Sequence, residues 1–111
     1  MALPTLDEEA AWALAGAPTF VDRVALLPTW DRRLAWIEER TAGTEGEARR
    51  QVLIVRQVAG ELADAEVTDA EVIREVLRRA EEPDTGMVML AQARKADSED
   101  DFWRLIGGTE P

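Results

Sequence analysis

Residues 48–66 read ARRQVLIVRQVAGELADAE, and this stretch decides the fold. Its stripe positions recur at steps of four, three, four, three and four, which places them on one face of an α-helix. The stripe consists of Ala48, Val52, Val55, Ala59, Leu62 and, at its end, Glu66. Leu53 and Ile54 lie outside the stripe, so the helix is apolar on more than one side. That distribution is typical of a helix with neighbours on several faces.

Outward from this helix, a repeated capping pattern marks the helix starts. A Thr or Ser precedes an acidic residue by three positions at Thr5, Thr19, Thr44, Thr68 and Ser98. With the Pro and Gly residues that end helices, these caps predict six to seven helices. The expected ranges are about 6–15, 20–27, 30–41, 45–66, 70–82, 87–96 and 99–106. We therefore expect an all-α fold: a single helical domain over residues 1–111, forming one compact bundle around the central helix at about 45–66.

Two of these helices have unusual faces. The helix at 70–82 opposes an apolar stripe with charged residues at spacings of three and four, which permit ion pairs. We expect that charged face to be simply solvated.

Residues 87–90, Met-Val-Met-Leu, would alone suit a strand, but the chain lacks sustained alternation and hairpin turns. The sequence favours a helix there.

The composition narrows the functional classes. The 23 Asp and Glu residues against 13 Lys and Arg give a net charge of -10, which disfavours direct binding to nucleic acid or an anionic membrane. Without Cys or His, the chain lacks thiolate nucleophiles, Cys-based metal sites and the commonest general base. The absence of a long apolar run and of a basic-then-apolar leader favours a cytoplasmic location. We expect no enzyme activity, cofactor or metal.

One short motif resembles a catalytic signature. Glu61-Leu62-Ala63-Asp64 is similar to half of the magnesium-binding signature of the all-helical nucleotide pyrophosphohydrolases. The resemblance implies a carboxylate-magnesium hydrolase, which would need an upstream E-x-x-E. Neither Glu38-Glu39 nor Glu45-Gly46-Glu47 has that spacing. A single E-x-x-D turn is common in acidic helices, so a solvated surface is the favoured interpretation.

Tryptophans off the apolar stripes are candidates for binding. Trp12 stands beside acidic residues, and Trp36 stands among Arg32, Arg33 and Arg40. Tryptophan next to arginine is the composition of interaction hot spots. Stacking of Arg on Trp within the chain, or burial against another helix, would account for Trp36 equally well.

Leu53 and Ile54 are the second pair of candidates. Leaving either side chain in water forgoes about 1.5–3 kcal/mol of favourable free energy of burial. We therefore expect other residues to pack over each of them. We expect another helix of the chain to cover Leu53. Ile54 is expected to remain exposed and to contribute to a homodimer or partner surface.

These observations favour a non-catalytic protein-binding domain, such as a small adaptor, regulator or inhibitor that acts through helix faces. Its partner would be another protein or a second copy of the chain. The candidate protein-binding residues are Trp12, Arg32, Arg33, Trp36, Arg40, Leu53 and Ile54. One alternative is an acidic mimic of nucleic acid that blocks a basic groove. The other is the magnesium-dependent nucleotide hydrolase.

Overall fold

A computed structural model describes residues 19–107, in which six α-helices and no strand occur. The helices are α2 (Phe20–Ala25), α3 (Trp30–Ala42), α4 (Gly46–Asp64), α5 (Ala70–Glu81), α6 (Gly86–Ala93) and α7 (Glu99–Leu105). The predicted all-α bundle is confirmed, with helix bounds within about three residues of those expected from the caps. The helix expected at 6–15 and its cap at Thr5 lie outside the described residues. None of the six helices is long and apolar enough to cross a membrane.

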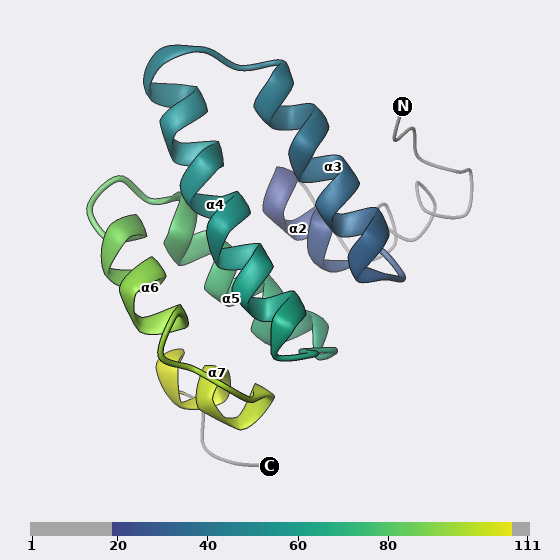
Figure 1. Ribbon diagram of the computed structural model, residues 1–111, viewed down its shortest axis with the longest axis vertical. Coiled ribbons are helices and arrows are strands. Elements are labelled where there is room, and N and C mark those ends of the chain that lie inside the picture. The colour runs from purple at the N-terminus through teal and green to yellow at the C-terminus, as the bar shows by residue number, and fades with distance from the viewer. Residues whose placement is uncertain (1–18, 108–111) are drawn as a thin grey trace.

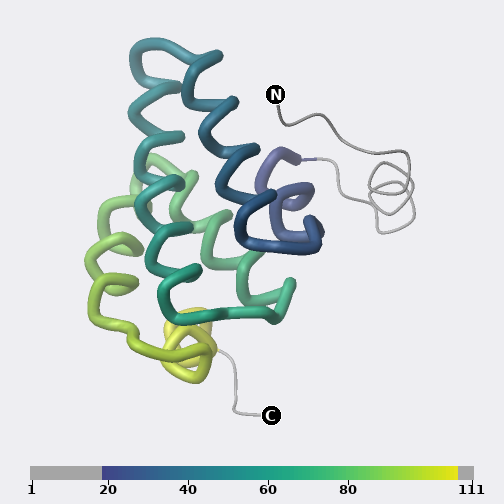
Figure 2. The backbone as a smooth tube through the Cα atoms, turned by 45° about the vertical axis from the view of Figure 1, so that its right-hand side comes forward, coloured from purple at the N-terminus to yellow at the C-terminus, as the bar shows by residue number. Residues whose placement is uncertain are grey.

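The bundle is built around a pair of helices, α4 and α5. α3 and α4 form an antiparallel hairpin, and α6 lies at the outer edge of the bundle beside α4 and α5 (Figures 1 and 2). α4 packs against α3, α5 and α6, whereas α5 packs against α2, α4, α6 and α7. Five side chains of α5 are completely buried: Val72, Ile73, Val76, Leu77 and Ala80. The predicted central helix therefore shares the centre with α5.

The buried side of α4 differs from the predicted stripe. Its buried residues are Ile54, Val55, Val58, Ala59 and Leu62. Ala48 is exposed and Val52 half-buried, because the turn between α3 and α4 projects beyond the other helices (Figure 1). The expectation that Ile54 is exposed was wrong: only 7% of it is accessible.

α6 is the reason that Ile54 is buried. Its first residue, Gly86, lies so close that an added Cβ would stand 2.6 Å from the Ala80 carbonyl oxygen and 3.5 Å from Ile54 Cγ2. The missing side chain at Gly86 thus lets α6 approach both α4 and α5. The side of α4 that carries Ile54, which was expected to face solvent, is therefore covered by α6.

Of the four predicted caps in the described residues, Thr19 and Ser98 are correct and two are not; Thr29 is a cap that the pattern did not predict. Thr19, Thr29 and Ser98 accept hydrogen bonds from the backbone N–H groups of Asp22, Arg32 and Asp101. At α4 the N-cap is Glu45, and the Thr44 hydroxyl donates to the Thr41 carbonyl instead. At α5 the N-cap is Asp69 rather than Thr68. There, Glu99 Oε1 at the start of α7 accepts from Thr68 N at 3.3 Å and from Asp69 N at 2.8 Å, and so ties α7 to α5.

A buried carboxylate joins α2 to α5. Asp22, 3% exposed, receives Arg74 Nε at 2.6 Å and lies 3.6 Å from Arg78 Nη2. The prediction that this charged face of α5 is simply solvated holds for Glu71 and Glu82, which are exposed. It is wrong for Arg74 and Arg78, because α2 packs beside them and Asp22 pairs with them. Burial raises the pKa of the Asp22 carboxyl, but the Thr19 and Arg74 hydrogen bonds and the two arginine charges outweigh it and hold the pKa below its ordinary value.

Candidate protein-binding surface

The described chain has two exposed large hydrophobic side chains, and both are on α6. Met87 is 61% exposed and Val88 is 58% exposed. Ala91, one turn further along, is exposed as well, whereas Met89, Leu90 and Ala93 point into the core. Residues at these spacings share one helix face. We call Met87, Val88 and Ala91 the α6 face.

α6 exposes this face because its sequence is apolar all round. Four consecutive apolar residues, 87–90, cover more of the helix circumference than α4 and α5 can bury. Single exposed hydrophobic residues are normal in soluble proteins, whereas contiguous exposed apolar patches are typical of interaction surfaces. This signal is present in the sequence as the run of four apolar residues at 87–90, whose pattern was interpreted only as secondary structure.

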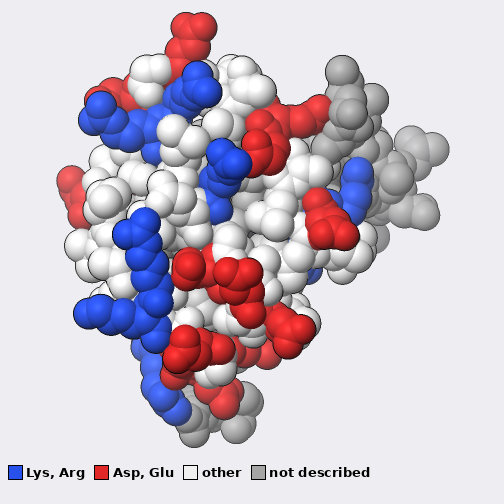
Figure 3. Space-filling model, in the orientation of Figure 1, with Lys and Arg blue, Asp and Glu red and all other residues white. Residues whose placement is uncertain are grey.

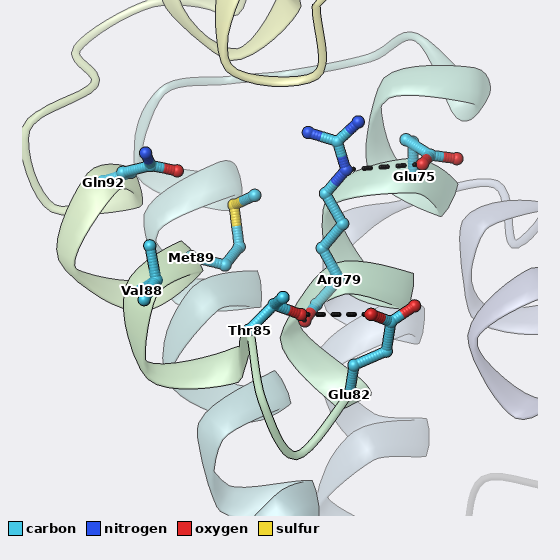
Figure 4. Close-up of a pocket in the computed structure, with 7 residues that line it drawn as sticks. All are labelled: Glu75, Arg79, Glu82, Thr85, Val88, Met89 and Gln92. Carbon is cyan, nitrogen blue, oxygen red and sulfur yellow. Dashed lines mark hydrogen bonds and ion pairs between the residues drawn. The ribbon is translucent and has the colours of Figure 1, made fainter.

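A groove between α5 and α6 adjoins the α6 face. It encloses about 350 Å³ and is lined by Glu75, Arg79, Glu82, Thr85, Val88, Met89 and Gln92. Figure 4 shows the α6 side chains on one wall and the α5 side chains on the other, with Thr85 between them. Val88 belongs to both the groove and the α6 face, so the two form a continuous surface.

The charged groups of this groove are engaged within the chain. Arg79 donates to the carbonyl oxygens of Leu105 at 2.8 Å and Ile106 at 3.1 Å, which satisfies the end of α7. Arg79 Nε also lies 3.4 Å from Glu75 Oε1. The Thr85 hydroxyl lies 2.8 Å from the Arg79 carbonyl oxygen and 3.2 Å from Glu82 Oε2. The polar wall is held in place by these contacts, whereas Val88 on the apolar wall is exposed.

The predicted arginine and tryptophan candidates on α3 contact their own chain. Arg33 is 7% exposed, with its guanidinium 4.7 Å from the centre of the Trp30 ring, and burial lowers its pKa. Arg40 is exposed and lies 5.1 Å from the Phe20 ring centre. Trp36 is half-buried and packs against Leu27 and the main core. Of the two explanations offered for Trp36, the structure shows its packing within its own chain, whereas the stacking of Arg33 is on Trp30.

The remaining candidates do not complete a patch. Arg32 and Leu53 are half-buried, and Ile54 lies beneath α6. Trp12 lies outside the described residues. The structure therefore spreads these residues over separate contacts, and their role in binding another protein stays a prediction.

Between residues 19 and 107, the acidic residues do not gather as the two alternatives require. Glu61 and Asp64 line a shallow hollow together with Arg94 and Asp97. Within residues 19–107, no group of three or more acidic side chains is placed to hold a metal ion. On the face drawn in Figure 3, the largest acidic group lies directly beside a run of basic side chains. That face is thus not the continuous acidic surface that nucleic-acid mimicry needs.

Comparison with known proteins gives no relative: no family model, no curated protein and no solved structure matches the chain.

Proposed function

We propose that the chain is a non-catalytic protein-binding domain and that the α6 face is its binding surface. The observation that carries this proposal is the pair Met87 and Val88, each more than half exposed on a bundle whose other large hydrophobic residues in the described range are buried or half-buried. The groove beside them supplies a polar rim, and interfaces typically combine an apolar centre with such a rim.

The absence of cysteine allows a clean test by site-specific crosslinking. A photoreactive maleimide would be attached to Val88→Cys and, as a matched control, to Ala48→Cys, which is exposed on the projecting start of α4. In a lysate of the source cells, light is expected to produce a discrete heavier product from Val88→Cys and none from Ala48→Cys. A crosslink to a second copy or to a different protein supports the proposal equally.

The specificity of the product is tested by adding Met87→Glu to Val88→Cys. A charge at the centre of an apolar contact is expected to cost at least about 2 kcal/mol, or roughly 30-fold in affinity, so the product should disappear. Circular dichroism should be unchanged, because Met87 is 61% exposed. Equal products from both cysteine positions, or a product that persists with Met87→Glu, would contradict the proposal.

A further inference from the structure

The ends of the α6 face carry opposite charges. Asp84 precedes α6, and Arg94 and Lys95 follow its last residue. Asp84 lies in the turn before α6 and Lys95 lies just beyond its last residue, so these two charges stand at opposite ends of the helix, with Val88 and Ala91 between them along the chain. The surface therefore runs from an acidic end, across an apolar centre, to a basic end.

The charges at these two ends are available for a partner. Asp84 and Lys95 are exposed, and neither side chain forms an ion pair or hydrogen bond with another residue in the described part of the chain. Arg94 makes one hydrogen bond, from Nη2 to Gln57 Oε1 at 2.9 Å, and no ion pair with a described residue. By contrast, Glu75 and Arg79 in the adjoining groove are paired with each other.

A surface of this pattern is complementary to itself. In a two-fold symmetric pair, the same patch occurs on both sides of the interface, so each residue must suit the residue that faces it. If two copies of α6 lie antiparallel, the Asp84 end of each meets the Lys95 end of the other, and the apolar centres coincide. The antiparallel arrangement also opposes the two helix dipoles favourably.

We propose that the α6 face binds a second copy of this chain, with the two α6 helices antiparallel; this inference rests on the proposed function of that face. α6 is only eight residues long, or about 12 Å, so the interface is small. Small interfaces form weak complexes, and we expect a dissociation constant on the order of 10–100 µM.

The net charge of -10 opposes association at long range. At physiological ionic strength the screening length is about 8 Å. Repulsion between distant charges is then largely screened, whereas the short-range contacts of Asp84 with Lys95 and of the apolar centres remain. The test should therefore be made at that ionic strength.

Charge reversal provides a test with a built-in rescue. Asp84→Lys brings two basic ends together in the proposed pair, and Lys95→Asp brings two acidic ends together, so each variant alone should associate more weakly than the unaltered chain. In an equal mixture, the two variants restore both opposite-charge contacts across one interface. Sedimentation velocity should show a concentration-dependent dimer for the unaltered chain, about tenfold weaker association for each variant, and recovery in the mixture.

The control pair is Glu39→Lys and Arg49→Glu, which are exposed on α3 and α4 away from α6. These variants should associate like the unaltered chain. A chain that stays monomeric near 1 mM, variants that associate normally, or a mixture without recovery would each overturn the antiparallel pair. Crosslinking of Val88→Cys to a different protein would still support the proposed function, so the two failures can be distinguished.

Discussion

Phe102→Ala is expected to lower the free energy of unfolding by about 3–5 kcal/mol, the largest effect of any change considered for this chain. Phe102 is fully buried and is the one buried side chain of α7. Small domains are stable by only about 5–15 kcal/mol, so this loss is a large fraction of the total. Urea denaturation followed by circular dichroism measures it directly.

The effect of Phe102→Ala extends beyond the cavity that it leaves. α7 has seven residues and is too short to be helical by itself, so it depends on its packing against α5. Loosening α7 would also weaken the Glu99 contact with the start of α5 and the contact of Arg79 with the end of α7.

Val88→Ala is the matched control for Phe102→Ala. Val88 is 58% exposed, so its truncation should change stability by less than about 0.5 kcal/mol. If Phe102→Ala lowered the free energy of unfolding by less than about 1 kcal/mol, the described packing of α7 against the bundle would be contradicted. That result would mean that Phe102 is not buried in solution.

Asp22→Asn is expected to lower the free energy of unfolding at neutral pH by about 2 kcal/mol. The change removes the buried charge that Arg74 and Arg78 face. Breaking a buried pair costs about 3–5 kcal/mol, but both arginines are partly exposed and can be solvated, which reduces the loss. Hydrogen bonds to charged groups contribute about 1.5–3 kcal/mol, consistent with that figure.

The pH dependence of this difference has a defined sign. The pKa of Asp22 is lower in the folded chain than its ordinary value of 3.8, so the folded state favours the ionised carboxylate. The advantage of the unaltered chain over Asp22→Asn should be complete above pH 3.8 and should be lost as the pH falls through the lower, folded pKa. Comparing the two proteins cancels the titration of the other carboxylates. A difference that stays constant on acidification would contradict the pairing of Asp22 with α5.

Much of the fold could be predicted from local sequence signals. The caps at Thr19 and Ser98 act within one helical turn, so the sequence alone locates them. At α5, by contrast, the cap moved from Thr68 to Asp69, where Glu99 from a distant helix binds the two free N–H groups. Such a long-range contact has no local signal.

The candidate surface was harder to predict because periodicity gives the faces of a helix but not what covers each face. Ile54 was correctly placed away from the Val55 and Ala59 stripe, yet α6 covers it. Gly86 permits that approach, and its role depends on the positions of α4 and α5. Conversely, the exposure of Met87 and Val88 could have been predicted from the sequence. A short helix at the edge of a bundle cannot bury apolar residues on its whole circumference.

Whether the α6 face binds a second copy is tested most directly by backbone amide NMR spectra of ¹⁵N-labelled protein, diluted from about 1 mM to about 10 µM, a range that spans the expected dissociation constant. Concentration-dependent shifts are expected for residues 84–95 and for Glu75, Arg79 and Glu82 along the groove, with little change on α3. Shifts concentrated at residues 32–40 of α3, or spectra that do not change on dilution, would contradict the assignment of the self-binding surface to α6.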